Sequence, residues 1–127
     1  MNWLNYYNNV FLKQLEDTDR LRKNAQEDIL CDAYVKLFNT ACELIKLYIN
    51  YNGLFQFEKR DVVKEAFYVE LIEDGEIWIN ALSLAEVYET EETKNFNNLI
   101  LSYCADEYFS IFKKLKDKFE QIKEEYE

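Results

Sequence analysis

The side chains of this sequence that could carry chemistry are thiols and carboxylates, because histidine is absent. The chain contains 3 Cys and 25 Asp and Glu residues but no His. Histidine is the most frequent general base in enzymes and the most frequent ligand of transition metals in proteins. Its absence excludes nucleophilic catalysis by a Ser-His or a Cys-His pair. The sequence therefore offers no candidate residues for that chemistry.

Carboxylates alone can bind hard cations such as Mg²⁺ or Ca²⁺, so the composition leaves a site of that kind open. With 25 acidic residues on predicted helical surfaces, however, close pairs of carboxylates are expected to arise by chance. The simpler interpretation is a set of solvated helix faces. We therefore predict no metal site and no cofactor.

The three cysteines are far apart in the sequence, at Cys31, Cys42 and Cys104. Their number is odd and none belongs to a Cys-x-x-Cys motif. This pattern is typical of buried structural thiols in a reducing compartment rather than of disulfides or a zinc site. It predicts a cytoplasmic protein.

The formal net charge of -10 at pH 7 restricts the partners that the chain can bind. An acidic surface repels a phosphate backbone, so we expect no autonomous binding to nucleic acid or to an anionic membrane, although a charged patch could be local. No apolar run approaches the roughly 20 residues of a membrane span, and the first five residues lack a basic region followed by an apolar one.

The composition also indicates what kind of scaffold holds these side chains. A chain of 127 residues and 15.4 kDa suits one domain, 1–127. Average usage would give about six Pro and about nine Gly, yet the sequence has no Pro and 2 Gly. Because 17% of the residues are aromatic, the chain is too hydrophobic for intrinsic disorder. We expect a folded, helical protein.

Apolar residues recur at steps of three and four, which is the spacing of amphipathic helices. The segment from Ile29 to Ile49 carries two adjacent apolar stripes, so we expect this helix to be the most buried. The fold class is predicted as all-α, a mostly antiparallel bundle of four main helices plus a short fifth. The predicted helices run from Leu4 to Leu15, from Ile29 to Ile49, from Arg60 to Ile72, from Ile77 to Ala85 as the short one, and from after Thr90 to Tyr126.

Local signals predict where these helices begin and end. The first helical pattern fades between Asp17 and Arg22. Asn24 followed by Glu27 resembles a capping box for the second helix, and Asn52-Gly53 is its expected C-terminal stop. Asp74-Gly75 is expected to break the third helix, and Thr90 is the expected N-cap of the last one.

Two blocks of sequence resemble the nucleotidyltransferase substrate-binding proteins. The first is Asp32-Ala-Tyr-Val-Lys-Leu-Phe38 followed by Glu43-Leu44, which is similar to the second helix of that family. The second is the stretch Lys59-Arg-Asp-Val-Val-Lys-Glu-Ala-Phe67 with Leu71-Ile-Glu-Asp-Gly-Glu-Ile-Trp78, which is similar to the third helix, turn and start of the fourth. The resemblance covers about residues 28–88.

The family in turn resembles the wider HEPN group of small helical dimers. Some HEPN proteins are ribonuclease toxins that use an Arg followed closely by a His, often with a Tyr after it. That motif would fall just after Trp78, but residues 80–93 contain neither Arg nor His, and only Tyr88 matches. The resemblance therefore implies that the ribonuclease centre is missing.

The resemblance implies a non-catalytic substrate-binding or regulatory subunit that partners a minimal nucleotidyltransferase, in a toxin-antitoxin-like pair, and forms a homodimer. It suggests Tyr88, Trp78 and Glu43 as substrate- or partner-binding residues. Each position also has a structural interpretation: Trp78 as a core anchor and Glu43 as a buried or semi-buried hydrogen-bond acceptor. Two other functions stay open, a HEPN-type ribonuclease toxin with a divergent centre and a purely structural protein-interaction dimer.

Overall fold

The computed structural model describes the backbone of residues 2–24, 27–51, 58–88 and 94–126, and the side chains of residues 2–23, 30–50, 58–86 and 107–125. All regular structure in these segments is helical, which confirms the predicted all-α class. The elements are α1 (Trp3–Tyr6), the π-helix η1 (Tyr7–Phe11), α2 (Leu12–Asn24), α3 (Glu27–Tyr51), α4 (Lys59–Tyr68), α5 (Gly75–Tyr88) and α6 (Lys94–Tyr126).

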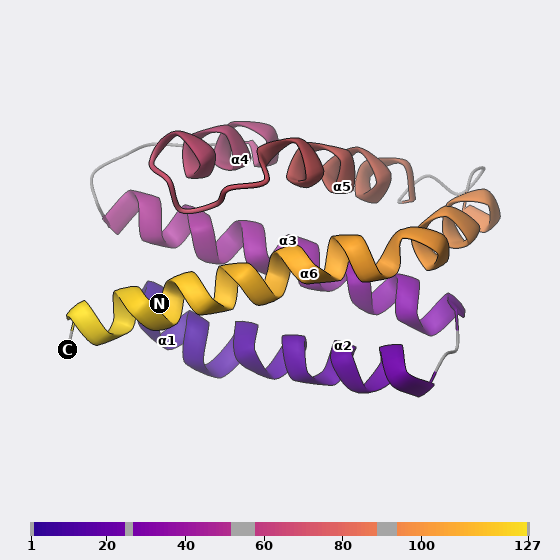
Figure 1. Ribbon diagram of the computed structural model, residues 1–127, viewed down its shortest axis with the longest axis horizontal. Coiled ribbons are helices and arrows are strands. Elements are labelled where there is room, and N and C mark those ends of the chain that lie inside the picture. Colours follow the sequence, from indigo (N-terminus) through magenta and orange to yellow (C-terminus); the bar gives the residue numbers. More distant parts are fainter. Residues whose placement is uncertain (1, 25–26, 52–57, 89–93, 127) are drawn as a thin grey trace.

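Figure 1 shows that the chain reverses direction between its long elements. It runs along α2, returns along α3, reverses at the turn between α4 and α5 so that α5 runs in the direction of α2, and returns along α6, so that both termini lie at the same end. Helix α3 contacts each of the other helical elements, α1, η1, α2, α4, α5 and α6. It also contributes more buried hydrophobic residues than any other element among the described side chains, as its two apolar stripes predict.

The first helical stretch contains a π-turn because of the spacing of its buried residues. An α-helix makes a turn every 3.6 residues, so three successive steps of four residues rotate the side chains by about 120° away from one face. The wider turn of η1 absorbs this rotation, since a π-helix holds more residues per turn. The buried side chains at steps of four are Trp3, Tyr7, Phe11 and Leu15.

The predicted end of the first helix between Asp17 and Arg22 is wrong, because α2 continues to Asn24. The extra turns are polar and are supported by ion pairs along the helix. Asp17 pairs with Arg20, and Asp19 pairs with Arg22 at 3.1 Å and with Lys23 at 3.6 Å. Pairs at these spacings stabilise a helix by a few tenths of a kcal/mol each. Thr18 is buried here, so the buried face continues with a polar residue that the apolar pattern does not register.

The third helix also ends earlier than predicted. We expected a helix to Ile72 with its break at Asp74-Gly75, but α4 ends at Tyr68 and Gly75 begins α5. The end is a Schellman motif: the amide of Leu71 donates to the carbonyl of Ala66 at 2.8 Å, and the amide of Glu70 donates to the carbonyl of Phe67 at 3.1 Å. Glu70 occupies the left-handed position, with φ at 63°.

Three other predicted boundary signals lie outside the described residues. They are the side chain of Asn24 in the expected capping box, the Asn52-Gly53 stop and the Thr90 N-cap. None of the helices in the described part of the chain is long and apolar enough to cross a membrane.

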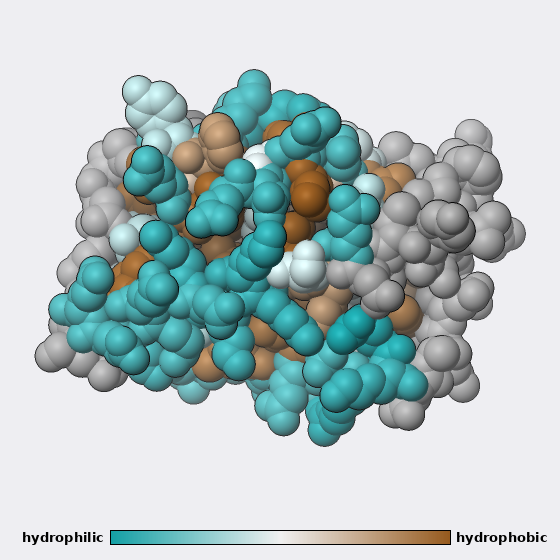
Figure 2. Space-filling view, in the orientation of Figure 1, coloured by the Kyte–Doolittle hydropathy of each residue, from teal (hydrophilic) through white to brown (hydrophobic). Residues whose placement is uncertain are grey.

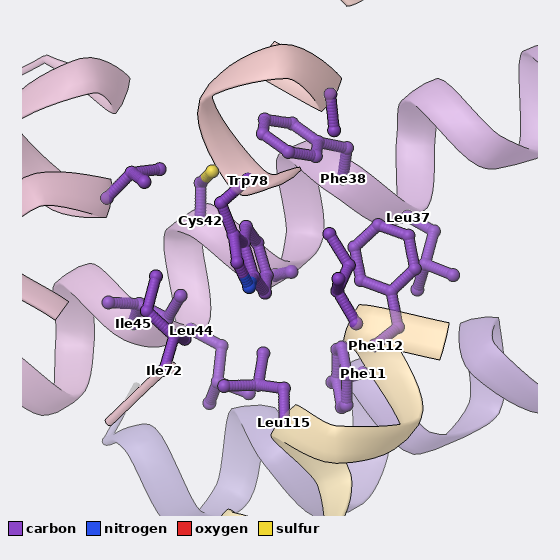
Figure 3. Packing of buried hydrophobic residues seen from close by; sticks show 14 of the residues in the cluster. Phe11, Leu37, Phe38, Cys42, Leu44, Ile45, Ile72, Trp78, Phe112 and Leu115 are labelled. Atoms are coloured by element: carbon purple, nitrogen blue, oxygen red, sulfur yellow. The ribbon is translucent and has the colours of Figure 1, made fainter. Parts of the chain in front are cut away.

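The core beside α3 is built from aromatic rings of three helices. Trp78 of α5 packs edge to face against Phe112 of α6, with ring centroids 5.6 Å apart, and lies 5.7 Å from the ring of Phe38 of α3 (Figure 3). The thiols of Cys31 and Cys42 are buried in the same core, in agreement with their prediction as buried structural residues. The side chain of Cys104 lies outside the described residues.

Candidate functional site

Of the three residues suggested by the sequence, the structure describes the side chains of Trp78 and Glu43. Trp78 is 1% exposed and points into the core, where Figure 3 shows it among Phe38 and Phe112. Glu43 is exposed on α3, so its interpretation as a buried or semi-buried acceptor is wrong. Tyr88 is the last residue of α5, and its side chain lies outside the described residues. Glu43 and Trp78 therefore do not form a common site.

One edge of Trp78 nevertheless reaches a concave site. A cavity of about 270 Å³ lies between the α4–α5 turn and α6. In Figure 2, which has the orientation of Figure 1, hydrophobic surface lies in a hollow between hydrophilic side chains on the face that carries this turn. The apolar residues that line the cavity are Leu71, Ile72, Trp78, Ile111 and Leu115.

The Schellman motif places both the apolar and the acidic parts of this cavity. The left-handed residue turns the chain sharply after α4, which directs Leu71 and Ile72 into the core, where each is 5% exposed. Glu70 stays at the rim and is exposed. The turn therefore places a carboxylate beside an apolar wall.

Asp74 connects the turn to α6. Its backbone carbonyl accepts from the amide of Trp78 at 3.0 Å, which begins α5. Its carboxylate accepts a hydrogen bond from the ammonium group of Lys114 at 2.7 Å. This hydrogen bond, together with the negative charge of Asp74, raises the pKa of Lys114, whose ammonium group is therefore kept charged.

The rim of the cavity carries more negative than positive groups. Its carboxylates belong to Glu70, Glu73, Asp74 and Asp117, and its ammonium groups belong to Lys114 and Lys118. Because Lys114 is paired with Asp74, the remaining groups leave the rim acidic. An apolar wall beside unpaired negative charge suits a cationic group on an apolar stem. No cluster of three or more potential metal ligands is found among the described residues.

A second concavity lies along α2 and α6 and is close to neutral, with one more carboxylate than ammonium groups. It has a volume of about 710 Å³, and its rim includes four carboxylates and three ammonium groups. On its floor, the ring of Phe109 is covered by the guanidinium of Arg22 at 4.5 Å. The charged residues at its rim are Glu16, Asp19, Lys113, Lys116, Asp117, Glu120 and Lys123. Because its positive and negative groups nearly cancel, this surface has little charge with which to select a ligand.

Beside the turn lies an exposed apolar surface that the sequence reading missed. Phe67, Tyr68 and Val69 are 53%, 83% and 41% exposed, and they are the exposed large hydrophobic residues of the described chain. Consecutive helical residues point about 100° apart, so three large apolar residues in a row cannot all face one core. This rule could have predicted that some of the three residues are exposed. Phe67 and Val69, however, continue the helical spacing of Val62, Val63 and Ala66, which favours a buried face for them.

The fold and this site define an all-helical protein with an acidic, partly apolar cavity that could bind a cationic group. A family model described as nucleotidyltransferase substrate binding protein like matches residues 3–121. The chain therefore belongs to this family, and the match extends the resemblance seen at residues 28–88 over nearly the whole sequence. Among curated proteins, the comparison found no match for this chain.

Proposed function

We propose that this chain is a substrate-binding or regulatory subunit without catalytic activity of its own, which works with a separate minimal nucleotidyltransferase. The observation that carries the proposal is the family match over residues 3–121. The composition supports it, because a chain with 2 Gly and no His offers neither a Gly-rich phosphate loop nor a histidine base. The nucleotide and the metal are then bound by the partner.

We further infer that the two proteins form a toxin-antitoxin-like pair in which the helical subunit is HEPN-like. Residues 80–93 lack the Arg and the His of the HEPN ribonuclease centre, so the present chain presents substrate or regulates the partner instead of cutting RNA. The acidic cavity beside the α4–α5 turn is the described feature best suited to this binding role.

The gene neighbourhood and co-purification test this function. We expect a small nucleotidyltransferase to be encoded next to this chain, and the two proteins to elute together when they are expressed together. Adding the helical protein to the purified enzyme should then change the rate of nucleotide transfer. The proposal fails if the mixed proteins show neither an affinity better than about 1 mM, which corresponds to roughly -4 kcal/mol, nor any change in transfer.

We also propose that the chain is a homodimer. The support is the family resemblance, together with an aromatic content of 17%, which is more than a small helical domain easily buries. Light scattering at micromolar concentration should give twice the mass of 15.4 kDa. A monomeric mass would contradict the proposal.

A further inference from the structure

The end of α4 presents apolar side chains in a form that suits binding. Phe67, Tyr68 and Val69 are consecutive, and Tyr68 is 83% exposed. Isolated exposed hydrophobic residues are common on proteins, whereas these three large ones are consecutive and expose apolar surface together at the end of one helix. Tyrosine and phenylalanine are enriched at the centres of protein interfaces, where they supply large contact areas with little loss of conformational entropy.

In this patch, defined by residues 67–69, the ring of Phe67 and the backbone are held in place by their neighbours. A Cβ atom on Gly75 would lie 3.0 Å from Cδ2 and 3.2 Å from Cγ of Phe67, so the ring of Phe67 rests directly against the backbone at the start of α5. The hydrogen bonds of the Schellman motif fix the backbone on the other side. An interface that is ordered before binding loses less entropy when its partner arrives.

The charge next to the patch indicates the chemistry of what binds there. Glu70 follows Val69 directly and shares the rim of the adjacent cavity with Glu73 and Asp117. Glu70 also holds a left-handed backbone conformation that has a steric cost for a residue other than glycine. Glycine would relieve this cost but would remove the carboxylate. The patch and the cavity together therefore match a surface with apolar and positively charged side chains.

We propose that the end of α4 and the α4–α5 turn form the docking surface for the partner nucleotidyltransferase, which inserts a Lys or Arg side chain into the acidic cavity and covers the residue 67–69 patch with apolar side chains. This inference rests on the proposed function, since it names the surface through which that partner binds. A volume of about 270 Å³ is small for a free organic ligand but fits one long side chain.

A second copy of this chain fits the surface less well. In a symmetric dimer the same surface meets itself, so the acidic rim that carries Glu70 and Glu73 would face a second acidic rim. Like charges brought together in this way oppose association, and each chain already carries a net charge of -10. A partner with a positively charged surface is attracted by the same carboxylates.

The test measures the affinity of the full chain for the nucleotidyltransferase encoded beside it, by calorimetry at low and at high salt. We expect Tyr68→Ala to weaken binding about tenfold or more, because central aromatic residues dominate interface energies. Glu70→Gln keeps the side-chain size but removes the charge, and should weaken binding several-fold at low salt with a smaller effect at high salt. Thermal unfolding of each variant alone should match the wild type, because both side chains are exposed.

Glu86→Gln is the matched control. Glu86 is exposed on α5, eleven residues or about 16 Å along the helix from Gly75, and it does not line the cavity. Its substitution should change the affinity less than twofold.

If Tyr68→Ala and Glu70→Gln also change the affinity less than twofold while the wild-type complex forms, the proposed docking surface is wrong and the proposed function stands. If Tyr68→Ala instead converts a dimer into a monomer, a second copy covers the patch. If the wild-type proteins do not associate at all, both proposals are overturned.

Discussion

Glu70 adopts a backbone conformation that glycine usually occupies at the end of a helix. Its φ is 63°. Among the described residues other than glycine, Glu70 alone has a positive φ. In this region the Cβ atom approaches the following carbonyl, which costs about 1–2 kcal/mol for an L-residue. The hydrogen bonds from the amides of Glu70 and Leu71 hold the conformation despite this cost.

Glu70→Gly should therefore stabilise the isolated protein. Relief of the steric cost is partly offset by the greater freedom of glycine in the unfolded chain, so we expect a net gain of roughly 0.5–1 kcal/mol in the free energy of unfolding. Urea denaturation measures this gain. Glu73→Gly is the control, because Glu73 is exposed in the same turn without a positive φ and should lose stability or show no change. A loss with Glu70→Gly equal to that of the control would show that the left-handed turn is not strained.

The same substitution separates stability from binding. Because Glu70→Gly removes the carboxylate at the cavity rim, the stabilised variant should bind the nucleotidyltransferase more weakly, by about the same factor as Glu70→Gln. A variant that gains stability and binds at full strength would show that the carboxylate has no role in docking. Calorimetry on the two variants side by side decides between these outcomes.

Cys42 gives the stability of the protein a dependence on alkaline pH. Burial raises the pKa of this thiol from 9.0 to about 12 in the native state. Between these values the unfolded chain has lost the proton and the native chain retains it, so stability falls as the pH rises from about 9 towards 12. One such group contributes a slope of at most about 1.4 kcal/mol per pH unit.

Cys42→Ala should therefore flatten the stability profile above pH 9. It is expected to cost about 1 kcal/mol at pH 7 through lost packing, and the gap to the wild type should narrow as the pH rises. Urea denaturation at about pH 7, 9 and 10 tests this, because the thiol of the unfolded chain begins to ionise within this range. Leu44→Ala, which removes a buried group that does not titrate, should keep a constant gap. A constant gap for Cys42→Ala as well would contradict the buried neutral thiol.

At the scale of the elements, periodicity predicted the helices well but not their irregular joints. The positions of α3 and α6 follow from apolar stripes that recur at steps of three and four. The end of α4 could not be read in this way, because Val69, Leu71 and Ile72 keep an apolar pattern through the turn while Glu70, a good helix former, stands where a glycine signal would be expected. The π-turn at η1 can likewise be predicted only by comparing the four-residue spacing of the buried side chains with the number of residues per turn of an α-helix.

The sequence could not predict the candidate site for a related reason. Trp78 was suggested as a binding residue or as a core anchor, and the structure buries it against Phe38 and Phe112, which lie on other helices, where it also lines the cavity. Glu70 and Asp117 line the same cavity only because the turn folds back onto α6. No spacing along the chain predicts that they share a cavity.

The central position of α3 gives a prediction about stability. Leu37 and Phe38 are completely buried and adjacent, and α3 contacts each of the other helical elements. Leu37→Ala or Phe38→Ala should lower the free energy of unfolding by about 2–5 kcal/mol, since each leaves a cavity in a packed core. Lys36→Ala, exposed on the same helix, should change it by less than about 0.5 kcal/mol. Losses below about 1 kcal/mol for both core variants would contradict the placement of α3.

At the scale of the whole molecule, charge restricts what the protein binds. The chain has 25 acidic and 15 basic residues, yet several lysines gather on the second half of α6. Carboxylates accompany them there: Lys114 is paired with Asp74, and Asp117 and Glu120 lie on the same stretch of helix. The lysines concerned are Lys113, Lys114, Lys116, Lys118 and Lys123. Such an interrupted patch attracts RNA weakly, because phosphate binding needs uncompensated positive charge.

The last prediction concerns ribonuclease activity, which we expect to be absent from the isolated protein. Acid-base cleavage of RNA needs a proton acceptor near neutral pH, and the chain has no His to supply one. The net charge of -10 also opposes the approach of the substrate. The purified chain, incubated with fluorescent single-stranded RNA at low salt and in the presence of a chelator, should cleave no more than buffer does. Cleavage that is lost in Tyr88→Phe would contradict this, because it would place a divergent ribonuclease centre at the position where the family resemblance leaves only a tyrosine. Cleavage that survives in that variant, and that separates from the protein on a further column, would instead come from a contaminant.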